Sequence, residues 1–168
     1  IDPASGADLA LADAIDITRQ FSALGGLRLM ISGGEPLLYK DLKQFIAHTA
    51  DLQLRRALLS NGTLIDASNI GWLNVEEIQF SLDGWTDGHD LLRGAGTFAR
   101  TIQGMRLAKE SGLAVSVATM IHRGNLTEFE RLRDFMDEIG VLEWGIDVPV
   151  TAGSLQEHSE LLVPYAEA

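Results

Sequence analysis

The sequence predicts an α/β fold in which parallel strands alternate with helices. Short apolar runs that end in glycine, asparagine or aspartate alternate with segments whose apolar residues recur at helical spacing. This alternation is typical of parallel strands joined by crossover helices. With 168 residues, 46% of them hydrophobic, the chain is long enough to bury one core. Periodicity alone leaves two architectures open, an open doubly wound sheet and an arc of a β/α barrel.

The helical segments are defined by apolar spacing and by residues that begin or end helices. The first helix has one apolar face, formed by Leu11, Ala14, Ile15, Thr18 and Phe21, and Gly25-Gly26 ends it. Three later helices are expected to begin at capping residues, namely Asp41, Thr97, and Asn125 with Glu128 three positions on. A short helix is expected over residues 65–73.

Five strands are expected, near residues 27–32, 56–60, 77–82, 114–121 and 143–148. Each is a short apolar or β-branched run, which is typical of strands buried on both faces of a parallel sheet. We expect them to be parallel and adjacent in sequence order. In a barrel arc the helices would cover one outer face, whereas in an open sheet they would cover both faces. Residues 1–150 then form one core, and residues 151–168 are expected to be a tail or a linker.

Composition excludes several classes of protein. A net charge of −11 argues against nucleic-acid binding, which depends on Lys and Arg. No apolar run approaches the length of a membrane span, and the cytoplasm is the expected compartment. The chain has no cysteine and therefore no disulfide. The histidines, His48, His89, His122 and His158, lack metal-ligand spacing.

Polar residues and glycines gather where the expected strands end, which is where parallel β/α folds bind ligands. The clusters are Gly33-Gly34-Glu35, Ser60-Asn61-Gly62, Ser81-Leu82-Asp83-Gly84 and His122-Arg123-Gly124-Asn125. Glu35 can hold an ammonium group, Asp83 can accept ribose hydroxyls, and Arg93 can pair with a carboxylate. Taken singly, each is more often a turn or surface residue. Taken together, they match an amino acid joined to a nucleoside.

These segments resemble the radical S-adenosylmethionine (radical SAM) superfamily. Ser32-Gly33-Gly34-Glu35-Pro36-Leu37-Leu38 resembles that family's Gly-Gly-Glu motif, and Leu59-Ser60-Asn61-Gly62-Thr63 resembles its next strand end. Phe80-Ser81-Leu82-Asp83-Gly84, followed by His89-Asp90 and Leu92-Arg93-Gly94, resembles the sulfatase-maturating and peptide-modifying (SPASM-type) subgroup of iron–sulfur oxidoreductases. The resemblance covers roughly residues 9–149. It favours the barrel arc, as five βα units of a partial (β/α)6 barrel.

The resemblance implies a set of cofactor-binding residues: Gly33, Gly34, Glu35, Ser60, Asn61, Ser81, Asp83, Arg93, Met120 and Ile121. Glu35 would receive the methionine amino group of S-adenosylmethionine (SAM). Ser81 and Arg93 would contact its carboxylate, Asp83 its ribose, and Met120 or Ile121 its adenine. It also implies that the parent enzyme uses SAM and a [4Fe–4S] cluster to modify a peptide or a small cofactor precursor.

The chain departs from the family at its start. The family's Cys-x3-Cys-x2-Cys loop is absent, and Ile1 to Gly6 occupy the place that follows it. We therefore expect a truncated piece that lacks the first strand, holds no cluster and is inactive. We also expect it to bind SAM weakly at best and to pair with another chain through its open sheet edge. Two alternatives remain: a naturally cluster-free scaffold or binding subunit, and an unrelated α/β enzyme whose loops mimic the motifs.

Overall fold

The computed structural model describes residues 8–149 and 159–163, and within them five strands form one sheet. The strands are β1 (Arg28–Ile31), β2 (Arg55–Ser60), β3 (Glu77–Ser81), β4 (Ala114–Met120) and β5 (Trp144–Asp147). They lie in sequence order, and every neighbouring pair is parallel. The predicted strands, their direction and their order are therefore confirmed.

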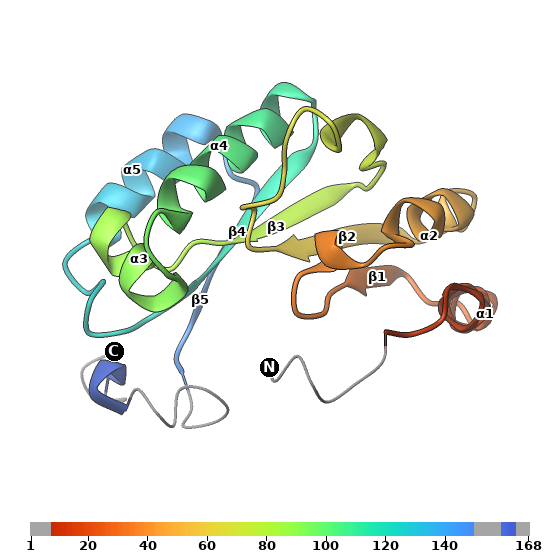
Figure 1. The fold of residues 1–168 in the computed structure, drawn as a ribbon, viewed down its shortest axis with the longest axis horizontal. Coiled ribbons are helices and arrows are strands. Elements are labelled where there is room, and N and C mark those ends of the chain that lie inside the picture. The colour runs from red at the N-terminus through yellow and green to blue at the C-terminus, as the bar shows by residue number, and fades with distance from the viewer. Residues whose placement is uncertain (1–7, 150–158, 164–168) are drawn as a thin grey trace.

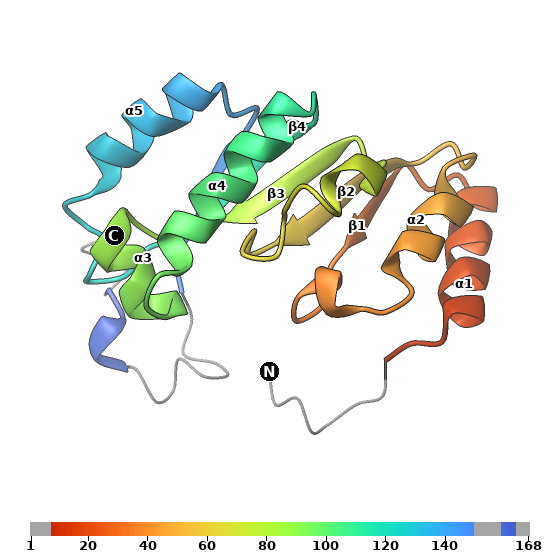
Figure 2. The same ribbon diagram turned by 45° about the horizontal axis from the view of Figure 1, so that its top comes forward.

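The helices cover one side of this sheet (Figures 1 and 2). They are α1 (Leu11–Ala23), α2 (Leu42–Thr49), α3 (Thr86–Arg93), α4 (Thr97–Glu110) and α5 (Phe129–Ile139). Short 3₁₀ turns are η1 (Pro36–Leu38), η2 (Ile70–Trp72) and η4 (Ser159–Leu161). Helices on one face only identify an arc of a β/α barrel and reject the open doubly wound sheet.

The two faces of the sheet differ in chemistry. The face toward the helices is apolar, and fully buried Phe80 and Val117 pack there with Met105 of α4. The opposite, concave face has polar residues at every second position of β3, which are Glu77, Gln79 and Ser81. The expectation of strands with two apolar faces was wrong for this reason: helices cover one face alone.

A buried carboxylate lies on this concave face, at the amino-terminal end of β3. Glu77 is 2% exposed, and it pairs with Arg28 at 3.4 Å and with Arg55 at 3.0 Å. Ser116 donates a third hydrogen bond to it at 2.5 Å. The neighbouring guanidinium groups and these hydrogen bonds outweigh the effect of burial and lower the pKa of Glu77. The cluster joins β1 to β4 at the end of the barrel arc away from the strand carboxyl ends.

Several helix boundaries differ from the prediction. The helix expected over 65–73 is only the turn η2, and α3 was not anticipated. Asp41 stands at the start of α2 without a capping hydrogen bond from its side chain. The cap of α4 comes from Asp90, whose carboxylate accepts hydrogen bonds from the amides of Gly96 at 2.6 Å and Phe98 at 2.8 Å. Asp90, a residue of α3, therefore does what was assigned to Thr97.

The expected capping box of α5 serves the neighbouring loop instead. The helix begins at Phe129, and the Glu128 carboxylate accepts a hydrogen bond of 2.7 Å from the amide of Trp85, at the start of α3. The Asn125 side chain bonds the loop after β3. Both side chains therefore fix the 83–85 loop rather than their own helix.

Most of the expected tail or linker lies outside the described residues. Within residues 159–163, the Leu161 carbonyl accepts a hydrogen bond of 2.9 Å from the amide of Arg123, and Val163 is 5% exposed. This short segment therefore packs against the core beside the end of β4. Among the helices of residues 8–149 and 159–163, none has the length and apolar character needed to cross a bilayer.

Candidate cofactor site at the strand carboxyl ends

Glu35 connects the carboxyl ends of β1 and β2. One carboxylate oxygen, Oε1, accepts hydrogen bonds from the Ser60 hydroxyl at 2.9 Å and from the Leu37 amide at 3.2 Å. The other, Oε2, accepts one from the Asn61 amide at 2.9 Å. A carboxylate offers about four acceptor sites, so one site of Glu35 remains after its partners in the described residues are counted. The half-buried side chain is thus held in place and can still accept one more hydrogen bond.

Gly33 and Gly34 lie beside Glu35 on the exposed loop that follows β1. A Cβ atom at either position would have no protein atom within 4 Å, and neither residue has a positive φ. Nothing in the described chain therefore requires glycine here. A ligand can approach the backbone closely where two successive residues have no side chain and the space around them is free. The loop fits a cofactor in this respect.

We call the strand carboxyl ends and the loops that follow them the rim. Asp83, after β3, has the most hydrogen-bonded side chain and main chain of the rim. It is 1% exposed; its Oδ1 atom accepts a hydrogen bond of 2.7 Å from the Met120 amide, and its Oδ2 atom pairs with Arg93 Nε. Burial leaves a ribose little access to this carboxylate as it stands. The ribose contact stays a prediction. The observed task of Asp83 is to hold Arg93.

Arg93 is the last residue of α3, and its side chain is 32% exposed. Arg93 pairs with Asp83 through Nε, which leaves its two terminal nitrogens for a second carboxylate. Like Asp83, it lies at the carboxyl ends of the strands. The fold therefore places side by side two residues that are ten positions apart in the sequence.

The strand register places the remaining predicted residues. Ser81 is paired in register with Ala118, and Met120 with Asp147, so Ser81 and Met120 lie on the concave face. Ile121 follows Met120 and falls on the opposite face by strand alternation. Only Met120 of the two adenine candidates shares a face with Ser81. The small residues Ala57, Ala118 and Gly145 also lie on that face.

The end of β2 is fixed by α4. Thr101 of α4 donates a hydrogen bond of 2.7 Å to the Asn61 carbonyl, and Gly62 donates one of 2.9 Å to the Ser60 hydroxyl. A Cβ at Gly104 would lie 2.5 Å from the Gly62 carbonyl oxygen, so the helix touches the loop directly. The position of the Glu35 partners therefore depends on helix packing.

Three rim residues were missed as site residues: His89, His122 and Asn125. They are at most 1% exposed, and all contact the Asp83 main chain. One signal for them was present, because His89 belongs to the His89-Asp90 pair of the family resemblance. His89 was considered only as a metal ligand, so its structural role was not predicted.

Stability is expected to fall as the pH drops from about 6.5 to about 4. Burial lowers the pKa of His89 to about 4, and Asp83, Asp90, Arg93 and His122 act on it electrostatically. Between these pH values His89 is protonated in the unfolded chain but not in the folded chain. Its contribution to the free energy of unfolding is therefore complete above pH 6.5 and lost toward pH 4. It amounts to on the order of 2 kcal/mol. Urea unfolding at pH 7.5 and 5 measures it, and His89→Asn should lose the dependence in that window. An unchanged dependence in the variant would contradict this assignment.

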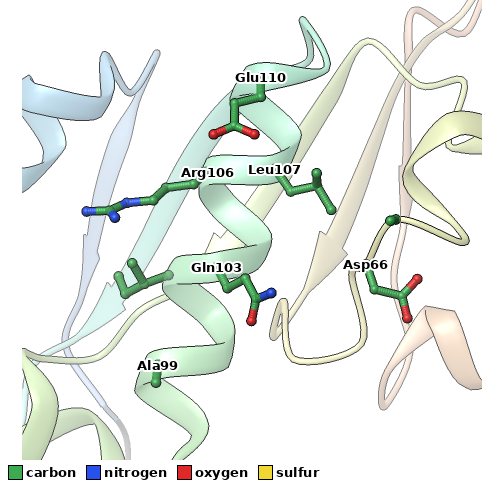
Figure 3. Close-up of a pocket in the computed structure, with 8 residues that line it drawn as sticks. Asp66, Ala99, Gln103, Arg106, Leu107 and Glu110 are labelled. Atoms are coloured by element: carbon green, nitrogen blue, oxygen red, sulfur yellow. The ribbon is translucent and has the colours of Figure 1, made fainter.

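The surface pocket in Figure 3 lies elsewhere. It has a volume of about 440 Å³ and is lined by α4 residues together with Asp66 and Ala67. Figure 3 shows the lining residues on α4, which lies on the helical side of the sheet, with Asp66 on the neighbouring loop. The pocket therefore does not coincide with the strand carboxyl ends.

Known proteins resemble this chain in sequence and in fold. The sequence matches the radical SAM superfamily over residues 4–136. The chain belongs to the radical SAM superfamily. It is 29% identical over 151 residues to an AdoMet-dependent heme synthase of Oleidesulfovibrio alaskensis, covering 87% of this chain and 39% of that protein. It is 28% identical over 141 residues to a PqqA peptide cyclase of Granulibacter bethesdensis, covering 81% of this chain and 38% of that protein.

Solved structures show the same fold. The structure of Streptococcus suis SuiB matches with a TM-score of 0.76 at 21% identity, over 84% of this chain and 34% of SuiB. SuiB has also been solved bound to S-adenosylmethionine and bound to its precursor peptide SuiA. This radical SAM chain therefore spans about two fifths of the length of its curated relatives and about a third of SuiB.

Proposed function

We propose that this chain provides the SAM-binding wall of a radical SAM enzyme. The main support is that Glu35 ties the ends of β1 and β2 together while Asp83 holds Arg93 at the end of β3. A carboxylate and a guanidinium at one edge of a parallel sheet are complementary to the ammonium and carboxylate of one amino acid.

The remaining acceptor site of Glu35 receives the methionine ammonium in this proposal. The terminal nitrogens of Arg93 and the Ser81 hydroxyl bind the carboxylate. The bare peptides of Gly33 and Gly34 allow close approach of the cofactor, and Met120 borders the adenine. Ser60 and Asn61 act through Glu35, because their hydrogen bonds orient its two oxygens. When bound, SAM supplies the sulfonium group whose reductive cleavage defines the family's chemistry.

The residues of this chain do not fit an iron–sulfur cluster. Thiolates are the usual ligands of such clusters, and the sequence contains no cysteine. Among the described residues, no group of three His, Asp or Glu side chains is placed to hold a metal ion either. We therefore assign no step of a reaction to this chain, and we expect no turnover by it alone.

The substrate of the whole enzyme is proposed to be a peptide or a small cofactor precursor. Some relatives are named PqqA peptide cyclase and others AdoMet-dependent heme synthase, which supports both classes. The alternative is a cluster-free subunit that binds SAM or a partner without catalysis. SAM binding is common to the enzyme and to one form of that alternative.

The proposal is tested by saturation-transfer NMR with SAM and with 5′-methylthioadenosine, which lacks the amino-acid end. We expect transfer to SAM with a Kd on the order of 1 mM, because no metal anchors the amino acid. Binding of 5′-methylthioadenosine should be weaker. Equal transfer to both ligands, or none to either, would contradict a site built around the amino-acid end.

A further inference from the structure

Two buried histidines hold the main chain of Asp83, one at its amide and one at its carbonyl. The Asp83 amide donates a hydrogen bond of 3.1 Å to His89 Nδ1, and His122 Nε2 donates one of 3.0 Å to the Asp83 carbonyl. The two side chains are 0% and 1% exposed. They come from α3 and from the loop after β4, so the contacts tie the end of β3 to both neighbours.

The hydrogen bonds define the protonation of both rings. His122 Nδ1 accepts a hydrogen bond of 3.2 Å from the Gly124 amide, so its proton resides on Nε2. His89 Nδ1 also accepts, and burial keeps this ring neutral, so its proton is on Nε2 as well. Each ring thus presents a lone pair at Nδ1 and a proton at Nε2.

One of those protons has no partner in the described part of the chain. His89 Nε2 is buried without a hydrogen bond, and the ring lies edge-on to Phe98 with centroids 6.1 Å apart. An unpartnered buried donor costs stability. An apolar residue would avoid this cost, so the lone pair at Nδ1 is the feature of His89 that the fold uses.

Every polar group of Asp83 is therefore engaged. The amide meets His89, the carbonyl accepts from His122 and from Asn125 at 2.6 Å, and the carboxylate meets the Met120 amide and Arg93. The main chain of Asp83 is thus held on both sides of its Cα atom, and the Met120 amide and Arg93 hold the carboxylate itself. Arg93 is then held by a rigid partner rather than by a mobile surface acid.

We propose that His89 and His122 are positioning residues that clamp the Asp83 main chain on both sides of its Cα atom and thereby preset Arg93 for the cofactor carboxylate. The clamp follows from contacts within the chain, and only its use toward a carboxylate rests on the proposed function. The two parts can be tested separately, because the Arg93 Nε–H group gives an NMR signal in the absence of any ligand.

The test uses paired amide substitutions that each keep one ring nitrogen's role. Asparagine places its oxygen where Nδ1 was, whereas glutamine places its amide nitrogen where Nε2 was. At position 89 the needed atom is the Nδ1 acceptor, so His89→Asn should preserve the clamp and His89→Gln should break it. At position 122 the needed atom is the Nε2 donor, so the order reverses: His122→Gln should preserve the clamp and His122→Asn should break it.

Two readouts are followed in all four variants. The Arg93 Nε–H signal should keep its wild-type position in His89→Asn and His122→Gln and move toward that of free arginine in the other two. SAM affinity should fall about tenfold in the clamp-breaking pair and less than twofold in the preserving pair. Both residues lose similar packing in each pair, so a merely structural role would not reverse the order between positions 89 and 122.

A measurement on the unaltered chain guards against variants that do not fold. Long-range ¹⁵N correlation spectra at pH 7 should show a protonated Nε2 and an unprotonated Nδ1 in both rings. A protonated Nδ1 in either ring would overturn the clamp. So would an Arg93 signal that is the same in all four variants. A clamp-dependent Arg93 signal without any SAM binding would leave the clamp standing and refute the proposed function instead.

Discussion

Glu35→Gln is expected to weaken SAM binding about tenfold while leaving 5′-methylthioadenosine binding unchanged. The substitution removes the negative charge that faces the ammonium, and a hydrogen bond to a charged group contributes about 1.5–3 kcal/mol. It also directs an amide N–H at a donor, because Glu35 accepts from Ser60 on one oxygen and from the Asn61 amide on the other. Calorimetric or NMR titration of both ligands measures the two affinities.

The second ligand is the control in this experiment. It has the adenosine part of SAM without the amino acid, so it reports on the rim but not on the ammonium contact. A parallel loss of affinity for both ligands would mean that Glu35 only shapes the rim. No loss for either would remove Glu35 from the cofactor site.

Gly104→Ala is expected to destabilise the fold by about 2 kcal/mol, lowering Tm by roughly 4–8 °C. The new Cβ would lie 2.5 Å from the Gly62 carbonyl oxygen and 3.3 Å from the Ile65 Cβ. Moving a backbone oxygen has a large energetic cost, so α4 must shift away from the loop after β2. The intrinsic gain of alanine over glycine in a helix, about 1 kcal/mol, offsets only part of this cost. Thermal unfolding measures the net effect.

Gly71→Ala provides a matched control. A Cβ at Gly71 would meet no atom within 4 Å, and its φ is not positive, so this substitution should leave stability unchanged within about 0.5 kcal/mol or raise it slightly. A Gly104→Ala protein as stable as the Gly71→Ala protein would show that α4 does not press on the loop that carries the Glu35 partners.

The strand order could be predicted because it depends on short-range signals. Each strand is a brief apolar run that stops at a turn residue, and short crossover helices leave little choice of topology. The alternation of Glu77, Gln79 and Ser81 also indicated a polar face, but it was overlooked. Helix α3 was missed because it has eight residues and contains Gly88, so it shows little helical pattern.

The roles of individual rim residues depended on long-range contacts. Asp83 and Arg93 were correctly grouped, but nothing in the sequence showed that Asp83 would be buried with its carboxylate occupied. Asn125 and Glu128 have the spacing of a capping box, yet tertiary contacts recruit both to the 83–85 loop. Local capping energies of about 1 kcal/mol are small enough for such contacts to override them.

The most direct test of the account is a residue-resolved NMR titration of the ¹⁵N-labelled chain with SAM. The account predicts that the amides of Gly33, Gly34 and Asn61 and the Arg93 Nε–H group shift together with one Kd. It predicts no shift at Gln103 or Arg106, which line the pocket on the helical side (Figure 3). Shifts confined to that pocket, or an unperturbed rim at SAM concentrations of about 5 mM, several times the expected Kd, would contradict the assignment of the strand carboxyl ends as the cofactor site.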